Sequence, residues 1–205
     1  MSDKTIGVVV PTRWEAKGIL RHFGFKRLGH ALYRTEINGR AILLCVSGVG
    51  RQAATAAARR LLASGSKELV SMGFCGALVP ELRVGDLVTD RVITVDRPAR
   101  TPEERRALTE RANAVAVDME TQAVIEAGTR AGVPIRILRV VSDQLEDDLT
   151  PMFGQDDCFS AWKIARRLLN PTVWPLAWKL KRHSEVASKS LVQALTQFCQ
   201  HIDPS

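Results

Sequence analysis

Short apolar runs alternate with stretches of helical periodicity over most of the chain. The apolar runs predict buried strands, and the periodic stretches predict helices. In chain order we expect a strand at 6–10, a helix at 13–23, strands at 31–37 and 40–46, a helix at 51–63, strands at 68–74 and 86–95, a helix at 102–112, a strand at 114–117, a helix at 119–131 and a strand at 135–141. This alternation predicts a single α/β domain, with a twisted, mixed but mostly parallel sheet flanked by helices.

The clearest local signal is Asn38-Gly39, which separates two of the predicted strands. Both residues tolerate positive φ, so this pair predicts a two-residue hairpin turn. After residue 150 the pattern becomes helical throughout, and the last segment, 184–202, predicts one more amphipathic helix. We therefore expect residues 1–150 to form the α/β core and 151–205 to complete the same domain with basic amphipathic helices.

The composition is that of a globular protein, with 45% apolar and 25% charged residues. The four cysteines have no C-x-x-C spacing, and the four histidines form no cluster in the sequence. This pattern predicts neither a disulfide framework nor a metal site, and no other cofactor is implied. The first apolar run is too short for a signal peptide, so we expect a cytoplasmic protein that is at most peripheral to a membrane.

The net charge of +7 is concentrated in one C-terminal segment, because six cations and no acid lie between Cys158 and Ser184. Three of the four tryptophans lie in the same segment, at 161–183. Tryptophan and leucine beside lysine and arginine are typical of a helix at a membrane interface, so an anionic membrane surface is one candidate partner. The alternative is a pair of helices packed on the sheet with solvated cations. Nucleic acid is not expected, because no reader motif accompanies the charge.

Glycines and acids gather where predicted strands end. Ser47-Gly48-Val49-Gly50 precedes a helix, and its backbone amides are suited to approach a polar ligand or, alternatively, to make a tight turn. Three acids, Glu15, Glu120 and Asp143, follow predicted strands. If these strands are parallel, the three carboxylates lie at one edge of the sheet. Each acid taken alone is equally suited to cap a helix or to balance its dipole.

Five blocks in this order resemble the superfamily of purine nucleoside phosphorylases and 5′-methylthioadenosine/S-adenosylhomocysteine nucleosidases. They are Ser47-Gly48-Val49-Gly50-Arg51, Met72-Gly73-Phe74-Cys75-Gly76-Ala77-Leu78, Val84-Gly85-Asp86-Leu87-Val88, Val117-Asp118-Met119-Glu120 and Arg139-Val140-Val141-Ser142-Asp143. The resemblance implies a nucleoside phosphorylase-like fold and cleavage of a purine N-glycosidic bond. It also suggests a homodimer.

The resemblance assigns a role to each acid. It implies that Asp143 protonates or hydrogen-bonds the purine N7, and that Glu120 binds the ribose hydroxyls while Met119 packs against the sugar. Glu15 would activate water, as in the nucleosidases. The matching blocks add further substrate-binding candidates, namely Ser47, Gly48, Gly76 and Ser142.

Three questions stay open at this point. Arg13 and Arg51 flank the proposed site and are candidates for binding phosphate, which would make the protein a phosphorylase, although we interpret Arg51 as structural. Only 33 positions separate Asp86 from Met119, where relatives have many tens, so part of the base pocket is expected to be missing. A non-catalytic nucleoside-binding protein is therefore another alternative. The shortened middle together with the basic, tryptophan-rich extension most resembles the hopanoid-associated branch, which implies adenosylhopane as substrate.

Overall fold

The computed structural model describes residues 5–154, 166–167 and 169–200. Its strands are β1 (Ile6–Val10), β2 (Lys26–Gly29), β3 (Leu32–Ile37), β4 (Arg40–Val46), β5 (Glu68–Ala77), β6 (Leu87–Val88), β7 (Val92–Thr94), β8 (Ala116–Asp118) and β9 (Ile135–Asp143). Its helices are α1 (Arg13–His22), α2 (Arg51–Ala63), α3 (Pro102–Ala112), α4 (Thr121–Ala131), α5 (Thr150–Phe153) and α7 (Trp174–Gln200), and a 3-10 turn, η1 (Pro171–Val173), precedes α7.

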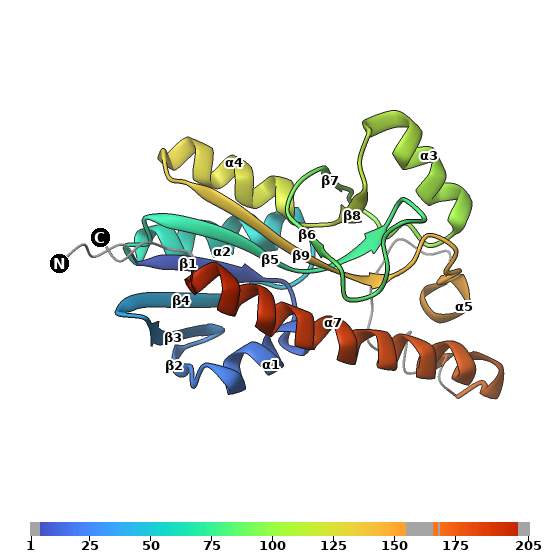
Figure 1. Ribbon diagram of the computed structural model, residues 1–205, viewed down its shortest axis with the longest axis horizontal. Helices are drawn as coiled ribbons and strands as arrows, with labels where there is room; N and C mark the ends of the chain where they lie inside the picture. The colour runs from blue at the N-terminus through green and yellow to red at the C-terminus, as the bar shows by residue number, and fades with distance from the viewer. Residues whose placement is uncertain (1–4, 155–165, 168, 201–205) are drawn as a thin grey trace.

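The strands form one mixed sheet (Figure 1), in the order β2-β3-β4-β1-β5-β8-β7, with β9 paired to both β5 and β6. The centre of the sheet is parallel: β1 lies between β4 and β5, and β9 runs beside β5 until Gly76 faces Asp143. The carboxyl ends of β1, β5 and β9 therefore point the same way. The expected α/β fold with a mixed, mostly parallel sheet and a helical C-terminal extension is confirmed.

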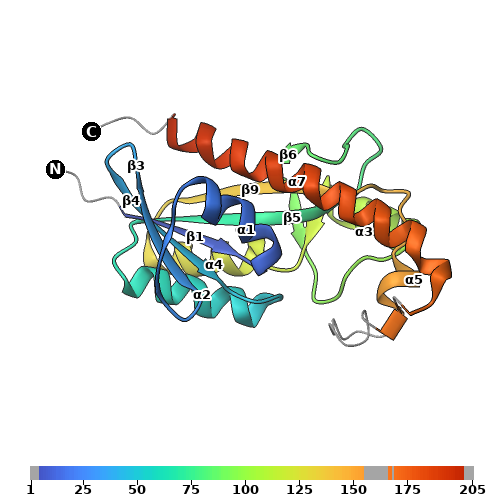
Figure 2. The same cartoon turned by 90° about the horizontal axis from the view of Figure 1, so that it is seen from below.

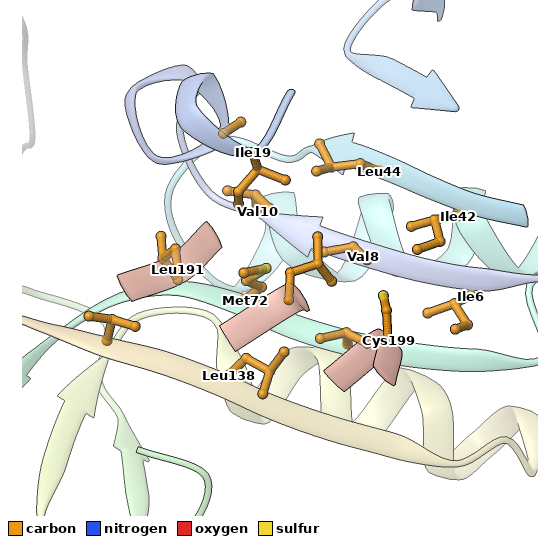
Figure 3. Close-up of a cluster of buried hydrophobic side chains, with 14 of the residues drawn as sticks. Ile6, Val8, Val10, Ile19, Ile42, Leu44, Met72, Leu138, Leu191 and Cys199 are labelled. Atoms are coloured by element: carbon orange, nitrogen blue, oxygen red, sulfur yellow. The ribbon is translucent and has the colours of Figure 1, made fainter. Parts of the chain in front are cut away.

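Helices cover both faces of the sheet (Figure 2). Successive side chains of β1 point to opposite faces and therefore contribute to both layers. Val8 packs with α1 and α7 in the cluster that Figure 3 shows, which also contains Met72, Leu138 and Leu191. Val9 points to the other face, where it joins the alanine-rich sides of α2 and α4. A strand that is buried on both faces must be apolar throughout, which explains the uninterrupted run in the sequence.

The hairpin at Asn38-Gly39 is confirmed. Ile37 pairs with Arg40, and the two turn residues have φ of 51° and 75°. Strand β2, which pairs with β3, was not expected from the sequence, because it has only four residues, Lys-Arg-Leu-Gly, and no apolar run.

The single strand expected at 86–95 is wrong. Arg91 has a φ of 48°, which an extended strand does not accommodate, and the chain turns there. Two short strands result, β6 beside β9 and β7 beside β8. The strand before Glu120 also differs from expectation, because β8 runs antiparallel to β5 and pairs with its last two residues, Gly76 and Ala77. Glu120 therefore follows a strand that is antiparallel to the central strand β5, and not a parallel one as expected.

The C-terminal helices also differ from the sequence-based expectation. No helix begins at Ser184, because α7 continues from Trp174 to Gln200. The Ser184 hydroxyl donates to the carbonyl of Lys181 inside the helix (2.7 Å) and does not cap a new one. Trp162 and Lys163, which belong to the basic segment 161–183, lie outside the described residues. Among the helices that the structure describes, none is both long and apolar enough to cross a membrane.

Candidate active site

Glu15 lies at the junction of β1 and α1 and forms a capping box with Thr12. Its Oε2 accepts hydrogen bonds from the Thr12 backbone N–H (2.9 Å) and hydroxyl (2.5 Å). Its Oε1 accepts from the backbone N–H of Phe74 (2.7 Å), near the end of β5. Burial raises the pKa of Glu15, although these hydrogen bonds and Arg139 oppose the shift. Glu15 therefore caps a helix and is also fixed at the carboxyl edge of the sheet.

Arg139, on β9, is the centre of the polar network, and sequence reasoning gave it no role. Its side chain is fully buried. Its donors are directed to three groups on neighbouring elements: Ser71 Oγ (2.9 Å), Thr121 Oγ1 (3.0 Å) and the carbonyl of Phe74 (3.2 Å). An arginine in the middle of the apolar run 137–141 was the available signal, because a buried charge requires buried acids nearby.

Three carboxylates supply the charge that Arg139 requires. Its guanidinium lies 2.9 Å from Asp118 and 3.5 Å from Glu120. Burial acts to lower the pKa of Arg139, but Asp118, Glu120 and Glu15 outweigh that effect and raise it. Glu15 and Glu120, which are distant in sequence, are therefore brought to one cation.

Glu120 stands at the N-cap position of α4, just before the first residue of the helix. Its Oε1 accepts a hydrogen bond from the backbone N–H of Gly50 (2.8 Å). The glycine loop before α2 therefore gives one amide to a protein carboxylate. Burial raises the pKa of Glu120 to about 7, with Arg139 and the Gly50 amide opposing. A carboxyl that gains its charge near neutral pH is suited to bind sugar hydroxyls in a pH-dependent way.

Three more residues were expected around the sugar, namely Met119, Ser47 and Gly48. Met119 is half-buried between β8 and α4. Ser47 is partly exposed and donates its backbone N–H to the carbonyl of Val10 at the end of β1 (2.9 Å), while Gly48, which is exposed, follows it. Ser47 and Gly48 therefore lie at the end of β1, in the loop whose Gly50 reaches Glu120.

Asp143 ends β9 and faces a cation that the sequence reasoning did not consider. Its Oδ2 lies 2.5 Å from Arg105 Nη2, and its Oδ1 accepts from the Ser142 hydroxyl (2.6 Å). The charged group that contacts Asp143 is thus the buried guanidinium of Arg105. Gly76 permits this arrangement, since a Cβ there would stand 2.8 Å from Asp143 Oδ2.

Two glycines on β5 mark where the acids meet the strand. A Cβ on Gly73 would lie 2.7 Å from Glu15 Oε1, and Gly76 stands against Asp143 in the same way. Three residues of extended chain span about 10 Å. Glu15 and Glu120 thus form one group around Arg139, and Asp143, at the end of β9, lies three residues farther along β5, against Gly76. That separation suits a nucleoside, with its sugar at one group and its base at the other.

The two arginines proposed for phosphate binding are placed differently. Arg51 Nε lies 3.4 Å from Asp96, and its Nη1 lies 3.5 Å from Glu126. These two carboxylates compete with any anion for Arg51. Arg13 is exposed at the start of α1.

Cys75 lies on β5 between the two groups of acids and is buried. Burial raises the pKa of its thiol well above the ordinary range. Because the thiolate is the reactive form, this cysteine is not suited to act as a nucleophile. Among the described residues, no group of three or more histidines, cysteines or acids is arranged to hold a metal ion.

Comparison with solved structures shows the same fold. The chain resembles the 5′-methylthioadenosine/S-adenosylhomocysteine nucleosidase of S. pneumoniae with a TM-score of 0.75 and 15% identity, over 97% of this chain and 100% of the other. It also resembles the futalosine hydrolase of Helicobacter pylori, with a TM-score of 0.68 and 17% identity, over 95% of this chain and 98% of the other.

Sequence comparison extends this result. The uridine phosphorylase of Salmonella typhimurium is 32% identical over 65 residues, which span 31% of this chain and about a quarter (26%) of that protein. The sequence profile of the phosphorylase superfamily matches residues 5–89 and 89–161. The profile covers most of the chain, including the residues that hold Glu15, Glu120 and Asp143, and this protein accordingly belongs to the phosphorylase superfamily.

Proposed function

We propose that this protein hydrolyses the N-glycosidic bond of an adenine nucleoside. In this proposal Glu15 activates the attacking water, Glu120 binds the ribose hydroxyls and Asp143 interacts with N7 of the departing base. Cleavage builds positive charge on the sugar and negative charge on the base, so carboxylates near the sugar favour the first of these changes. The neighbouring nucleosidase and hydrolase structures named above are consistent with this chemistry.

The observation that carries the proposal is that Glu15 and Glu120 share the charge of Arg139: Glu120 lies 3.5 Å from its guanidinium, and Arg139 acts to lower the pKa of Glu15. A general base is most effective when its pKa lies near the working pH, and burial shifts the pKa of Glu15 in that direction. An ionised carboxylate has about four acceptor positions, and Glu15 uses three of them for Thr12 and Phe74. One position remains for a water molecule.

The test is incubation with 5′-methylthioadenosine and S-adenosylhomocysteine, with and without phosphate, followed by mass spectrometry. Hydrolysis gives adenine and free ribosyl product regardless of phosphate. Glu15→Gln and Asp143→Asn are each expected to lower the rate by about 100-fold or more, because each removes a group that acts on the proton or the leaving base. Glu36→Gln, at an exposed position on β3, is the matched control.

The same experiment distinguishes the two alternatives. A ribose 1-phosphate product that requires phosphate would show a phosphorylase, which the pairing of Arg51 with Asp96 and Glu126 makes less favourable. Calorimetric binding of adenine nucleosides without any product would show a non-catalytic binding protein.

We further propose that the substrate is lipid-linked, as adenosylhopane is, and that the first half of α7 contacts an anionic membrane. All fully buried residues of α7 lie from Ala187 onward. In the first half, Trp174 and Trp178 are 58% and 63% exposed, and Lys181 lies 5.3 Å from the Trp178 ring. Exposed indoles beside cations are the composition of an interfacial helix.

The charge available to a membrane is smaller than the sequence alone indicated. Of the six cations, Lys179 lies 2.5 Å from Asp147, and Arg167 donates to the carbonyl of Thr150 (3.1 Å). Arg166, Lys181 and Arg182 are exposed, the last two beside the tryptophans, and Lys163 lies outside the described residues. Attachment should therefore depend on the indoles as much as on charge.

Sedimentation with phosphatidylglycerol vesicles at low salt tests the membrane proposal. We expect the protein to pellet with these vesicles and to be released by about 0.5 M salt, since screening is then nearly complete within a few ångströms. Trp178→Ser with Lys181→Glu should abolish binding. Arg59→Glu with Arg130→Glu, on α2 and α4, should retain most of it, and loss of binding in both pairs would contradict a specific role for α7.

The homodimer also stays a prediction, which sedimentation velocity would test.

A further inference from the structure

Arg105 is buried on α3, and its donors converge on the end of β9. The side chain is 1% exposed. Its Nε donates to the carbonyl of Ala99 (3.2 Å), its Nη1 to the carbonyl of Gln144, and its Nη2 to Asp143 Oδ2 (2.5 Å). The guanidinium therefore holds both Asp143, which we propose to act on the leaving base, and the carbonyl of the next residue, Gln144.

The carboxylate of Asp143 is fixed from three sides. Arg105 holds Oδ2, and the Ser142 hydroxyl donates to Oδ1 (2.6 Å). Gly76 lies against the same group, where a Cβ would be 2.8 Å from Oδ2 and 3.6 Å from Arg105 Cζ. Rotation of the Asp143 side chain would break both hydrogen bonds, so its direction is set before a substrate arrives.

We propose that Arg105 is a positioning residue for the leaving base: it fixes the orientation in which the carboxyl group of Asp143 meets the departing base. The inference rests on the proposed function and deepens it. Arg105 itself stays behind the carboxylate and does not touch the substrate.

If Arg105 served only to attach α3 to the segment after β9, its contact with Asp143 would not be needed. The link between α3 and the segment after β9 already exists at the surface, where Arg106 holds Glu146 with two hydrogen bonds (2.6 and 2.7 Å). Arg106 is the matched control, because it is the same residue type on the same helix, paired with an acid of the same segment. Its side chain is about half exposed, and it makes no contact with Asp143.

The experiment compares two leaving groups. One substrate is an adenine nucleoside, whose base needs help to depart, and the other is 4-nitrophenyl β-D-ribofuranoside, whose nitrophenolate leaves without it. We expect Arg105→Met to lower kcat for the adenine nucleoside by about 10- to 100-fold, because orientation contributes much of general acid–base catalysis. The rate with the nitrophenyl riboside should change by less than about threefold. Arg105→Lys, which keeps the charge, should recover part of the loss, and Arg106→Met should resemble wild type.

Equal losses on both substrates, or no loss on either, would overturn the inference. If Arg105→Met does not fold, the same comparison is made with Arg105→Lys, for which a selective loss on the adenine nucleoside is still expected.

If wild type cleaves neither substrate, the proposed function fails, and calorimetric binding of adenine decides the inference separately. Arg105→Met and Asp143→Asn should then weaken adenine binding equally, with no further loss in the double variant. Unchanged adenine affinity in Arg105→Met, or no adenine binding by wild type, would overturn it.

Discussion

At the scale of single residues, the site depends on how buried charges compensate one another. Arg139 is fully buried, and Asp118 and Glu120 lie within 3.5 Å of it. An isolated charge at this depth would cost several kcal/mol, so neither the cation nor the acids are tolerable alone. The group that we propose to act on the sugar is thus also part of what stabilises the centre of the sheet.

Replacing Arg139 should reveal this double role. Arg139→Met is expected to destabilise the protein by about 3–5 kcal/mol, because it leaves buried carboxylates without their cation. Urea denaturation measures the change. Arg136→Met is the matched control on the same strand, where an exposed arginine lies 3.3 Å from Glu68, and it should change stability by less than about 1 kcal/mol. Equal effects of the two substitutions would show that burial of Arg139 is not what matters.

The sequence located the acids but not their partners. Glu15, Glu120 and Asp143 were found because each follows a strand, and position along the chain is what a sequence records. Arg139 and Arg105 act through contacts between elements that are distant in sequence. Their roles depend on which face of a strand or helix is buried, and local patterns do not determine that.

At the scale of elements, α7 joins two parts of the molecule. Its second half packs on the sheet, and its first half is tied to the segment that follows Asp143. The tie is the buried carboxylate of Asp147, which lies 2.5 Å from Lys179 and also accepts from the backbone N–H of Gln144 (2.8 Å). One alternative for the basic segment was that its cations are solvated, but Lys179 is instead paired with a buried acid.

Removing that tie should have a measurable cost. Lys179→Ala is expected to destabilise the protein by about 1–3 kcal/mol, because Asp147 loses a charged hydrogen-bond partner while it remains buried. Burial alone would raise the pKa of Asp147, but Lys179 and the Gln144 amide outweigh it and lower the pKa. The stabilisation is therefore present above the ordinary aspartate range and is lost as pH falls through the folded-state pKa. Urea denaturation should show the difference from wild type at pH 7 and a smaller one near pH 3.

The control for this pair is Lys189→Ala, an exposed lysine in the second half of α7. It should leave stability within about 0.5 kcal/mol of wild type at both pH values. A loss of the same size in both variants would mean that Lys179 acts through the helix and not through Asp147.

The elements themselves were predictable where local chemistry decides them. The hairpin at Asn38-Gly39 was found because positive φ is a property of those two residues. The interval 86–95 was misjudged because Arg91 adopts positive φ under tertiary constraint, which its residue type does not announce. The direction of β8 was missed for a related reason: pairing with Gly76 and Ala77 is decided by the partner strand.

At the scale of the whole molecule, the buried acids set how stability depends on pH. Burial raises the pKa of Glu15 and raises that of Glu120 from 4.5 to about 7. The folded protein therefore binds these protons more tightly than the unfolded chain does. The stabilisation from these two groups should therefore be present when they are protonated, and the part that comes from Glu120 should be lost as pH rises from about 4.5 to about 7.

Glu120→Gln tests this dependence, because the amide is nearly the same size and does not ionise. Relative to wild type, it should gain stability as pH rises from 5 to 8, by on the order of 3 kcal/mol, which is the effect of a shift from 4.5 to about 7. Glu126→Gln, on the same helix but partly exposed, should give a curve parallel to wild type. If instead the Glu120→Gln curve runs parallel to wild type across this range, Glu120 is ionised throughout, and Arg139 outweighs its burial. The ribose would then meet a permanent carboxylate, and substrate affinity would be insensitive to pH near neutrality.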